Sequence, residues 1–379
     1  MLGSVAVPYQ MYSLTHSTVA VGALGLATLV PLLVVPLWGG AIADGADRRS
    51  VLLWTEAGMA GVTILFLVNA ALPHPQVWAL YVLTALAVTI FSLHRPALSS
   101  LTPRLIPGEE LPAGLSLMST SWNISAVAGP AIGGIVIAAV GITSSYAIDA
   151  GTYAASLVAL WALPRVPPDP NAQRASIGAI RDGLRYLKGR QALVGIFVTD
   201  TSAMVFGMPN ALFPALAVHH FGGGARAVGY LYAAPAAGAL GGSLVSGWVG
   251  GVRRQGIAVT VCACLWGAAI VAFGLVSALW VALILLAVAG MADFFSGVLR
   301  STMLMNATPD HLRGRLQGIE FMQVASAPNL GDLEAGVLAS LTSLRFSVVS
   351  GGFLCIAGCV ATTIALPGFL RYDSREPTA

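Results

Sequence analysis

Long apolar stretches fill most of this chain, and short polar breaks separate them. Only helices and closed barrels satisfy the backbone in lipid, and most of these stretches exceed a barrel strand of about 10 residues. Their length suits helices that cross the ~30 Å hydrocarbon core of a bilayer, which takes about 20 residues. The pattern predicts an all-α membrane protein with twelve spans: 1–14, 18–42, 51–72, 77–101, 116–140, 144–163, 192–217, 228–250, 257–277, 280–304, 317–342 and 346–370.

The second half of the chain repeats the first at a constant offset. The pair Arg48-Arg49 precedes the third span, and the pair Arg253-Arg254 precedes the ninth, 205 positions later. Arg95 in span four and Arg300 in span ten are also 205 positions apart. Internal duplication is common in secondary transporters, so we expect two pseudo-symmetric six-helix bundles.

The first span is shorter than the rest. Residues 1–14 cannot cross the hydrocarbon core as a helix. The repeat offset also maps the start of span seven to a position before Met1. We therefore expect the first helix to be truncated at its N-terminus by about a dozen residues.

A polar stretch, residues 164–191, lies between the two halves. It opens with several prolines, which end a helix. Ile177, Ile180, Leu184 and Leu187 then recur at helical spacing among basic residues. This spacing predicts a short amphipathic helix on the membrane surface, and a solvated linker is the alternative. The expected domains are a bundle over 1–163, a cytoplasmic linker over 164–191, a bundle over 192–370 and a cytoplasmic tail over 371–379.

Positive charge is distributed unevenly among the breaks. Of the 19 basic residues, 15 lie in the tail or in the breaks after spans two, four, six, eight and ten, the linker being the break after span six. The breaks after the odd-numbered spans hold only Arg226 and Arg345. Basic loops remain on the cytoplasmic side of a membrane. We therefore expect a multi-pass protein of the cell (inner) membrane with its linker and C-terminus in the cytoplasm.

Composition excludes several classes of protein. Charged residues make up 9% of the chain and hydrophobic residues 56%, against about 25% charged in soluble proteins. The one lysine, Lys188, follows no glycine-rich loop, which excludes a P-loop and hence an ATP-driven pump in this chain. Catalytic motifs such as HExxH and GxSxG are absent, and the four cysteines fit as small hydrophobic residues. The sequence thus predicts no enzyme, no cofactor, no metal site and no nucleic-acid partner.

The break after span two carries the first recognisable motif. Residues 39–49 resemble the loop G-x-x-x-D-R-x-G-R-R of the major facilitator superfamily, although Gly45 and Asp47 depart from that pattern. The resemblance implies a cytoplasmic gate, and an ordinary positively charged loop is the alternative. Three further gate candidates, Arg95, Arg300 and Glu320, lie near the cytoplasmic ends of their spans, and the repeat relates the two arginines. For Arg95 and Arg300 the alternative is a side chain that extends to the membrane interface as an anchor. The predicted gate is Gly40, Asp44, Arg48, Arg49, Arg95, Arg300 and Glu320.

Span five carries a second motif. Gly129, Pro130, Gly133 and Gly134 resemble the G-P-x-x-G-G core of the superfamily's antiporter motif, which accompanies exporters. Proline interrupts a helix and glycines allow two helices to approach closely. Plain close packing of small residues is the alternative interpretation.

Further pieces of sequence narrow the resemblance. The segments 91–96, 107–112, 148–150, 183–187, 221–224, 232–235 and 307–315 are similar, in order and spacing, to the enterobactin-exporter branch of the superfamily. That branch also contains macrolide-efflux-like members, so the resemblance does not specify the cargo.

Seven carboxylates lie inside predicted spans, where an unpaired charge costs at least ~2.5–3.5 kcal/mol. In the superfamily, spans seven and ten line the cavity, so Asp200 and Asp293 are expected to be coupling or cargo residues. Asp332 is a further candidate in the polar span eleven, and Asp149 is a fourth, with a structural role favoured. For Asp200 and Asp293 the alternative is a structural pair with Arg300 or with a neighbouring hydroxyl. Asp293 and Arg300 are seven residues apart, however, and are expected not to touch along a straight helix.

Together these features predict a secondary active exporter. It is expected to move a siderophore or hydrophobic small molecule by alternating access, driven by proton antiport, with cargo, protons and the lipid bilayer as partners and as a monomer. A macrolide or drug efflux protein is one alternative. The degraded loop and short first span leave a non-transporting receptor or scaffold on the same fold as the other.

Overall fold

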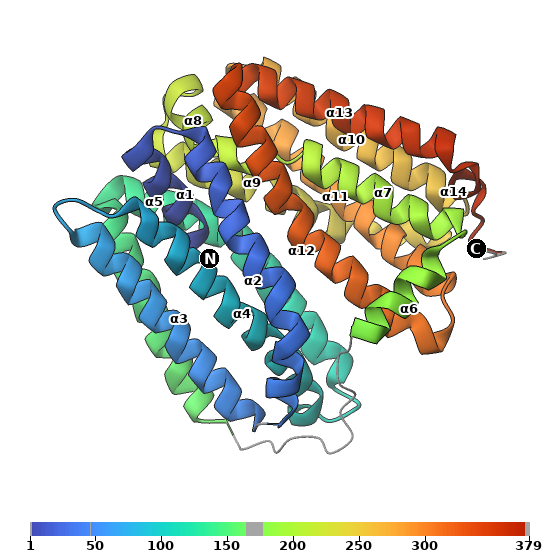
Figure 1. The fold of residues 1–379 in the computed structure, drawn as a ribbon, viewed down its shortest axis with the longest axis horizontal. Helices are drawn as coiled ribbons and strands as arrows, with labels where there is room; N and C mark the ends of the chain where they lie inside the picture. Colours follow the sequence, from blue (N-terminus) through green and yellow to red (C-terminus); the bar gives the residue numbers. More distant parts are fainter. Residues whose placement is uncertain (1, 46, 164–176, 376–379) are drawn as a thin grey trace. The chain divides into compact units, whose positions relative to one another are not determined.

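The structure is a computed structural model that describes residues 2–45, 47–163 and 177–375. Within these ranges the side chains of 36–45, 96, 99–100, 102–104, 112, 177–180, 182 and 311 are not described. The helices of the described chain (Figure 1) are α1 (Gly3–Thr15), α2 (Thr18–Gly45), α3 (Arg48–Ala71), α4 (Val77–Leu105), α5 (Leu111–Trp161), α6 (Ile177–Leu187), α7 (Gln191–Phe206), η1 (Asn210–Leu212), α8 (Phe213–Ala215), η2 (Leu216–His220), α9 (Gly224–Leu244), η3 (Ser246–Gly251), α10 (Gln255–Leu275), α11 (Leu279–Asn306), α12 (Asp310–Leu341), α13 (Leu344–Ala365) and α14 (Pro367–Arg371). The all-α prediction is confirmed.

The predicted spans correspond to these helices with two differences. Predicted spans five and six form one continuous element, α5, which contains a non-helical residue, Gly141, at φ 86° and ψ 170°. Glycine adopts such a conformation without steric cost, so the chain changes direction there. Predicted span seven is broken into α7, η1, α8 and η2.

Eight stretches of the described chain are long and apolar enough to cross a membrane. One of them, Ala113–Trp161, has 49 residues, sufficient for two crossings at about 20 residues each. The remaining predicted spans correspond to α1, α9 and α12, which are shorter or more polar.

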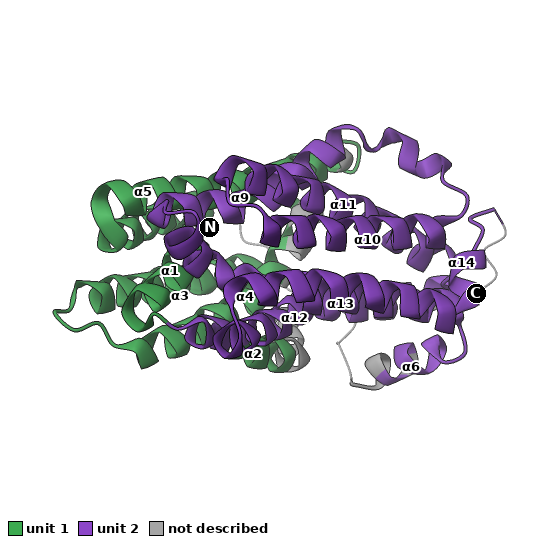
Figure 2. Ribbon diagram, turned by 90° about the horizontal axis from the view of Figure 1, so that it is seen from above, with its two compact units in different colours: residues 1–16, 26–176 green, residues 17–25, 177–379 purple. Residues whose placement is uncertain are grey.

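The chain divides into two compact units, coloured separately in Figure 2. Unit 1 contains residues 1–16 and 26–176, and unit 2 contains residues 17–25 and 177–379. The first turns of α2 therefore belong to unit 2 and the rest of that helix to unit 1.

Unit 1 is built around α3, which packs against α4 and α5. Leu52, Ala97 and Leu101 form a small buried cluster between these helices. Further along α5, the ring of Tyr146 stacks on Phe66 at 5.4 Å and its hydroxyl donates to Gln10 Oε1 at 2.8 Å. The phenol thus joins α1, α3 and α5.

Unit 2 contains a very close helix crossing between α9 and α11. A Cβ atom at Gly238 would overlap the carbonyl oxygen of Ala287, and one at Gly290 would overlap the carbonyl oxygen of Pro235. Each backbone therefore lies against a glycine of the other helix, the mode of packing that small residues allow in membranes. On another side of unit 2, Thr18 of α2 donates to the carbonyl of Gly336 in α12 at 2.8 Å.

The second part of the polar stretch forms the predicted helix, α6. It packs on α12 and α7, where Gly183 lies next to Ile319 and Leu187 is buried. Leu184, expected on the same apolar face, is 54% exposed. Residues 164–176 of this stretch lie outside the described residues.

The C-terminal segment docks on unit 2 through α14 and an ion pair. Arg253 and Asp373 lie 3.2 Å apart, and the backbone N–H of Arg375 donates to Asp373. This N–H and the guanidinium of Arg253 lower the pKa of Asp373. Because the carboxylate is more acidic in the folded chain, its contribution to docking is lost as the pH falls through that lowered pKa.

Candidate functional site

The most deeply buried ion pair of the described chain lies in unit 2, between α7 and α11. Asp200 of α7 is 4% exposed and Arg300 of α11 is 6% exposed, and the guanidinium Nη1 contacts Asp200 Oδ1. Removing one partner of such a pair leaves an uncompensated buried charge. The two residues are therefore tied to each other within unit 2.

Arg300 also reaches a second carboxylate. Its Nη2 lies 3.8 Å from Asp293 Oδ1, two turns earlier on the same helix. The expectation that these residues would not touch is wrong, because the long arginine side chain runs back toward the N-terminus of its helix. Asp293 is the more exposed of the two carboxylates, because 38% of its side chain is accessible against 4% for Asp200.

Gln323 of α12 completes the polar contacts of Asp200. Its Nε2 lies 3.1 Å from Asp200 Oδ2, 2.9 Å from Thr201 Oγ1 and 2.8 Å from the carbonyl oxygen of Phe197. One side chain of α12 thus binds both the backbone and the carboxylate of α7. Gln323 carries no charge, and nothing in its sequence surroundings distinguishes it from other polar residues of predicted span eleven.

Glu320 lies one turn before Gln323 on α12 and contacts α11. Its Oε1 accepts a hydrogen bond from Ser301 Oγ at 3.0 Å. Since Ser301 follows Arg300 in the chain, the polar residues of α11 and α12 face one another along this stretch. The predicted gate residues Arg300 and Glu320 are thus brought together beside Asp200.

Helix α7 ends shortly beyond Asp200, at a break centred on Gly207 and Pro209. Three side chains from three other helices bind the freed backbone groups. Trp266 Nε1 of α10 donates to the carbonyl of Gly207, and Tyr232 of α9 donates to the carbonyl of Asn210, both at 2.9 Å. Discontinuous helices in transporters mark substrate and ion sites.

Asp332 supplies the third of these contacts. Its Oδ1 accepts a hydrogen bond from the backbone N–H of Ala211 at 2.9 Å. The carboxylate therefore serves the start of η1 and is not part of the Arg300 cluster. Asp200 thus lies within α7 before the break in predicted span seven, and Asp332 binds the backbone just after it.

The fourth carboxylate candidate, Asp149, belongs to unit 1. It is buried in α5 and accepts a hydrogen bond from the backbone N–H of Gly3, in the first turn of α1. A carboxylate at a helix N-terminus is stabilised by the helix dipole. This geometry supports the structural role favoured for Asp149.

The predicted gate of unit 1 is described only in part. Gly40 and Asp44 lie in the last part of α2, residues 36–45, whose side chains are outside the described residues. Arg48 is buried, and Arg49 donates to the carbonyls of Leu160 and Trp161 at the end of α5.

Arg95 lies elsewhere on unit 1 and makes a different contact. Its guanidinium lies over the ring of Trp122 at 4.9 Å from the centroid, a cation–π geometry. The two symmetry-related arginines therefore have different surroundings, since Arg300 pairs with carboxylates and Arg95 stacks on an indole.

The glycine–proline motif of α5 lies against α1. Pro130, Gly133 and Gly134 are buried and Gly129 is half-buried, and the backbone of Leu2 would lie 3.4 Å from a Cβ atom at Gly133. A Cβ atom at Gly133 would therefore make only an ordinary van der Waals contact with this backbone.

Another titratable pair, which the sequence analysis did not connect, joins α3 and α4. His94 Nδ1 lies 2.9 Å from Thr55 Oγ1 and 3.7 Å from Glu56 Oε2. Glu56 and His94 are 38 positions apart on different helices, so helical spacing within one segment does not indicate this pair.

Sequence comparison relates the whole chain to exporters. The family of transmembrane secretion effectors matches residues 1–377. The enterobactin exporter EntS of Citrobacter koseri is 31% identical over 98% of this chain and 89% of its own length. The enterobactin exporters EntS of Shigella boydii and Escherichia coli are each 32% identical over the same shares.

Solved structures share the arrangement of helices. A mutant of the nucleoside transporter NupG superposes with a TM-score of 0.75 over 95% of this chain and 94% of its own, at 12% identity. A mutant of the peptide transporter POT in complex with sulfate gives 0.73 over 98% and 95%, also at 12% identity. At these identities the likeness shows the fold alone, and it agrees with the predicted arrangement of twelve spans.

Proposed function

Since this chain belongs to the transmembrane secretion effector family, in the enterobactin-exporter-like branch of the major facilitator superfamily, we propose that it exports a siderophore by exchange for protons. The full-length relation to named enterobactin exporters supports the cargo class. The protonatable cluster of Asp200, Asp293 and Arg300 supports the coupling.

The observation that carries the proposal is one guanidinium held between two carboxylates. Arg300 contacts Asp200 in the interior of unit 2 and Asp293 at its more open side. A cation balanced by two carboxylates leaves one negative charge in excess, which a proton can neutralise. Protonation of either carboxylate would leave Arg300 paired with the other.

Proton exchange at this cluster would act on α7 directly. Asp200 is bound by Arg300 of α11 and Gln323 of α12, so loss of its charge weakens the contacts that hold α7 to both helices. Alternating access needs helices whose packing has two stable arrangements. We propose that protonation of Asp200 favours one arrangement and cargo the other.

The test is transport in proteoliposomes with an acidic lumen. We expect wild-type protein to accumulate external enterobactin and to stop when a protonophore removes the gradient. Asp200→Asn should lower gradient-driven accumulation by about tenfold or more, the factor typical of losing a positioned proton-transfer group. Asp310→Asn is the matched control, because Asp310 is exposed and pairs only with Arg313 among the described residues.

Folding is controlled separately. Removing one partner of a buried ion pair costs about 3–5 kcal/mol, so the double variant Asp200→Asn with Arg300→Gln is compared after size-exclusion chromatography. The double variant should elute as a single monodisperse peak but should still lack gradient-driven transport. Full gradient-driven transport by well-folded Asp200→Asn would refute the coupling role. If the wild-type protein moves neither siderophores nor hydrophobic drugs under a gradient, the result would favour the alternative that the chain is a non-transporting scaffold.

A further inference from the structure

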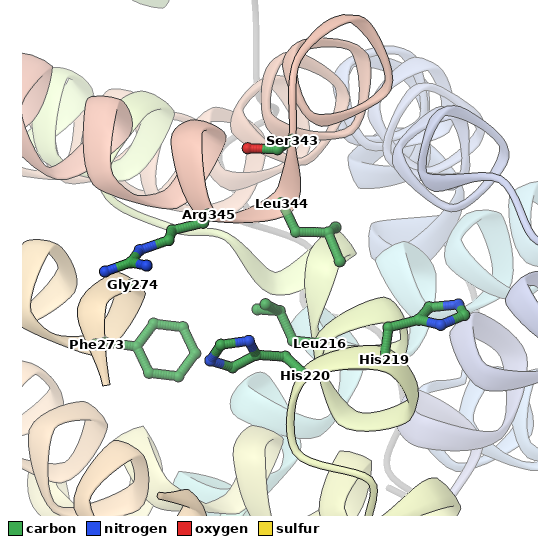
Figure 3. Close-up of a pocket in the computed structure, with 8 residues that line it drawn as sticks. All are labelled: Leu216, His219, His220, Phe273, Gly274, Ser343, Leu344 and Arg345. Carbon is green, nitrogen blue, oxygen red and sulfur yellow. The ribbon is translucent and has the colours of Figure 1, made fainter. Parts of the chain in front are cut away.

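A cavity lies in unit 2, away from the Asp200 cluster, and Figure 3 shows the side chains that line it. Its volume is about 270 Å³, and its walls come from η2, the last turn of α10 and the first turn of α13. The residues that matter here are Leu216, His219, His220, Phe273, Leu344 and Arg345. None of them belongs to the Asp200 cluster, and all of them lie beyond Gly207 and Pro209 in the chain.

The cavity combines an apolar wall with one guanidinium and an imidazole. Leu216 and Phe273 are buried, whereas Arg345 and His220 are exposed. In Figure 3 the guanidinium of Arg345 and the imidazole of His220 both lie beside the ring of Phe273. The residues that line the cavity include no carboxylate.

Arg345 is available to a ligand. Among the described residues its guanidinium forms no ion pair, and it is one of two basic residues in the breaks on its predicted side of the membrane. Guanidinium binds carboxylate and phosphate oxygens through two parallel hydrogen bonds. The sequence therefore places an anion-binding group where the other loops carry almost none.

The orientation of His220 is fixed by its neighbours. Its Nε2 lies 2.8 Å from the carbonyl oxygen of Val276, so this nitrogen carries a proton and donates. The ring meets Phe221 edge-on at 4.8 Å. These contacts hold the imidazole at the cavity, and π-helical turns such as Leu216–His220 occur frequently at functional sites.

We propose that this cavity binds a small organic anion, with its anionic group on Arg345 and a compact apolar body against Phe273 and Leu216. The volume lies below the roughly 300–1,000 Å³ of pockets for drug-sized ligands, which limits the occupant to a small molecule or to part of a larger one. Such a group can come from a soluble carboxylate or from the headgroup region of an anionic lipid.

The site is independent of proton coupling, and its test measures binding alone. Wild-type protein in phosphatidylcholine nanodiscs is titrated with 1-naphthoate and with neutral 1-naphthamide by saturation-transfer NMR. We expect 1-naphthoate to bind about tenfold more tightly, since charge-assisted hydrogen bonds are the stronger ones. Arg345→Gln should remove that preference, and Arg345→Lys should retain part of it.

Arg226→Gln is the matched control, because Arg226 is exposed on the same predicted side and does not line the cavity. Equal affinity for the two probes, or an equal loss in Arg226→Gln and Arg345→Gln, would overturn the proposal. A second arm adds phosphatidylglycerol to the nanodiscs. Competition with 1-naphthoate in the wild type, absent in Arg345→Gln, assigns the site to lipid, and unchanged 1-naphthoate binding assigns it to a soluble anion.

Discussion

At the scale of single residues, the candidate site is held together by one guanidinium, that of Arg300, which contacts both Asp200 and Asp293. Asp200, Asp293 and Arg300 were selected because charge inside a span needs a partner or a cavity. Their contacts depend on side-chain length and on the distance between two helices, which helical spacing does not contain. The straight-helix argument treated Arg300 as a point, whereas its guanidinium reaches Asp293.

Gln323 is the residue that sequence reasoning missed and the structure places at the centre of the cluster. Gln323→Leu would remove the hydrogen bonds to Asp200, Thr201 and the carbonyl of Phe197. We expect a loss of about 1–3 kcal/mol, the usual result of leaving buried polar groups unsatisfied, together with reduced gradient-driven transport. The melting temperature in detergent measures the first effect.

Gln317→Leu is the control for this substitution, because Gln317 is exposed on the same helix. It should leave both the melting temperature and transport unchanged. If the two variants behave alike, Gln323 does not contribute to the site.

At the scale of elements, the sequence located the spans but treated each as one rod. Span seven was predicted as continuous, yet it breaks at Gly207 and Pro209. Proline and glycine at that point are the available signal, since both weaken helices. The side chains that bind the freed backbone groups could not be predicted from the sequence. Tyr232, Trp266 and Asp332 lie on three other helices, and their contacts with the break depend on how those helices pack.

The crossing of α9 and α11 gives a prediction at the same scale. Gly238→Ala places a methyl group on the carbonyl oxygen of Ala287, and overpacking of this kind costs about 1–3 kcal/mol. Gly241→Ala, one turn later on the same helix, has open space around its Cβ atom. The melting temperature should fall for the first variant only, and an equal response of both would show that this crossing is not tight in the membrane.

At the scale of the whole molecule, the repeat and the positions of basic residues carried most of the information. The offset of 205 positions predicted the duplicated architecture, and the likeness to solved transporters confirms the fold. Orientation in the membrane remains a prediction from the charges alone. The division of α2 between the two units was not predictable, since no polar break marks it.

Impermeant maleimide labelling of intact cells tests the orientation. Single cysteines are introduced at His74, predicted outside, or at Lys188, predicted in the cytoplasm, after replacement of the four native cysteines. Both positions are exposed. Cys at position 74 should react in intact cells and Cys at position 188 only after permeabilisation, and the reverse pattern would invert the topology.

The break in predicted span seven also has a consequence for the order in which the protein assembles. Its three capping side chains, Tyr232, Trp266 and Asp332, all lie C-terminal to it in the chain. During synthesis this segment therefore leaves the ribosome before any of its partners exists, and its unpaired backbone groups cannot remain in lipid without cost. We expect this segment to stay beside the insertion machinery until α12 has been made, so that nascent chains ending before Asp332 remain sensitive to protease there and longer chains become resistant.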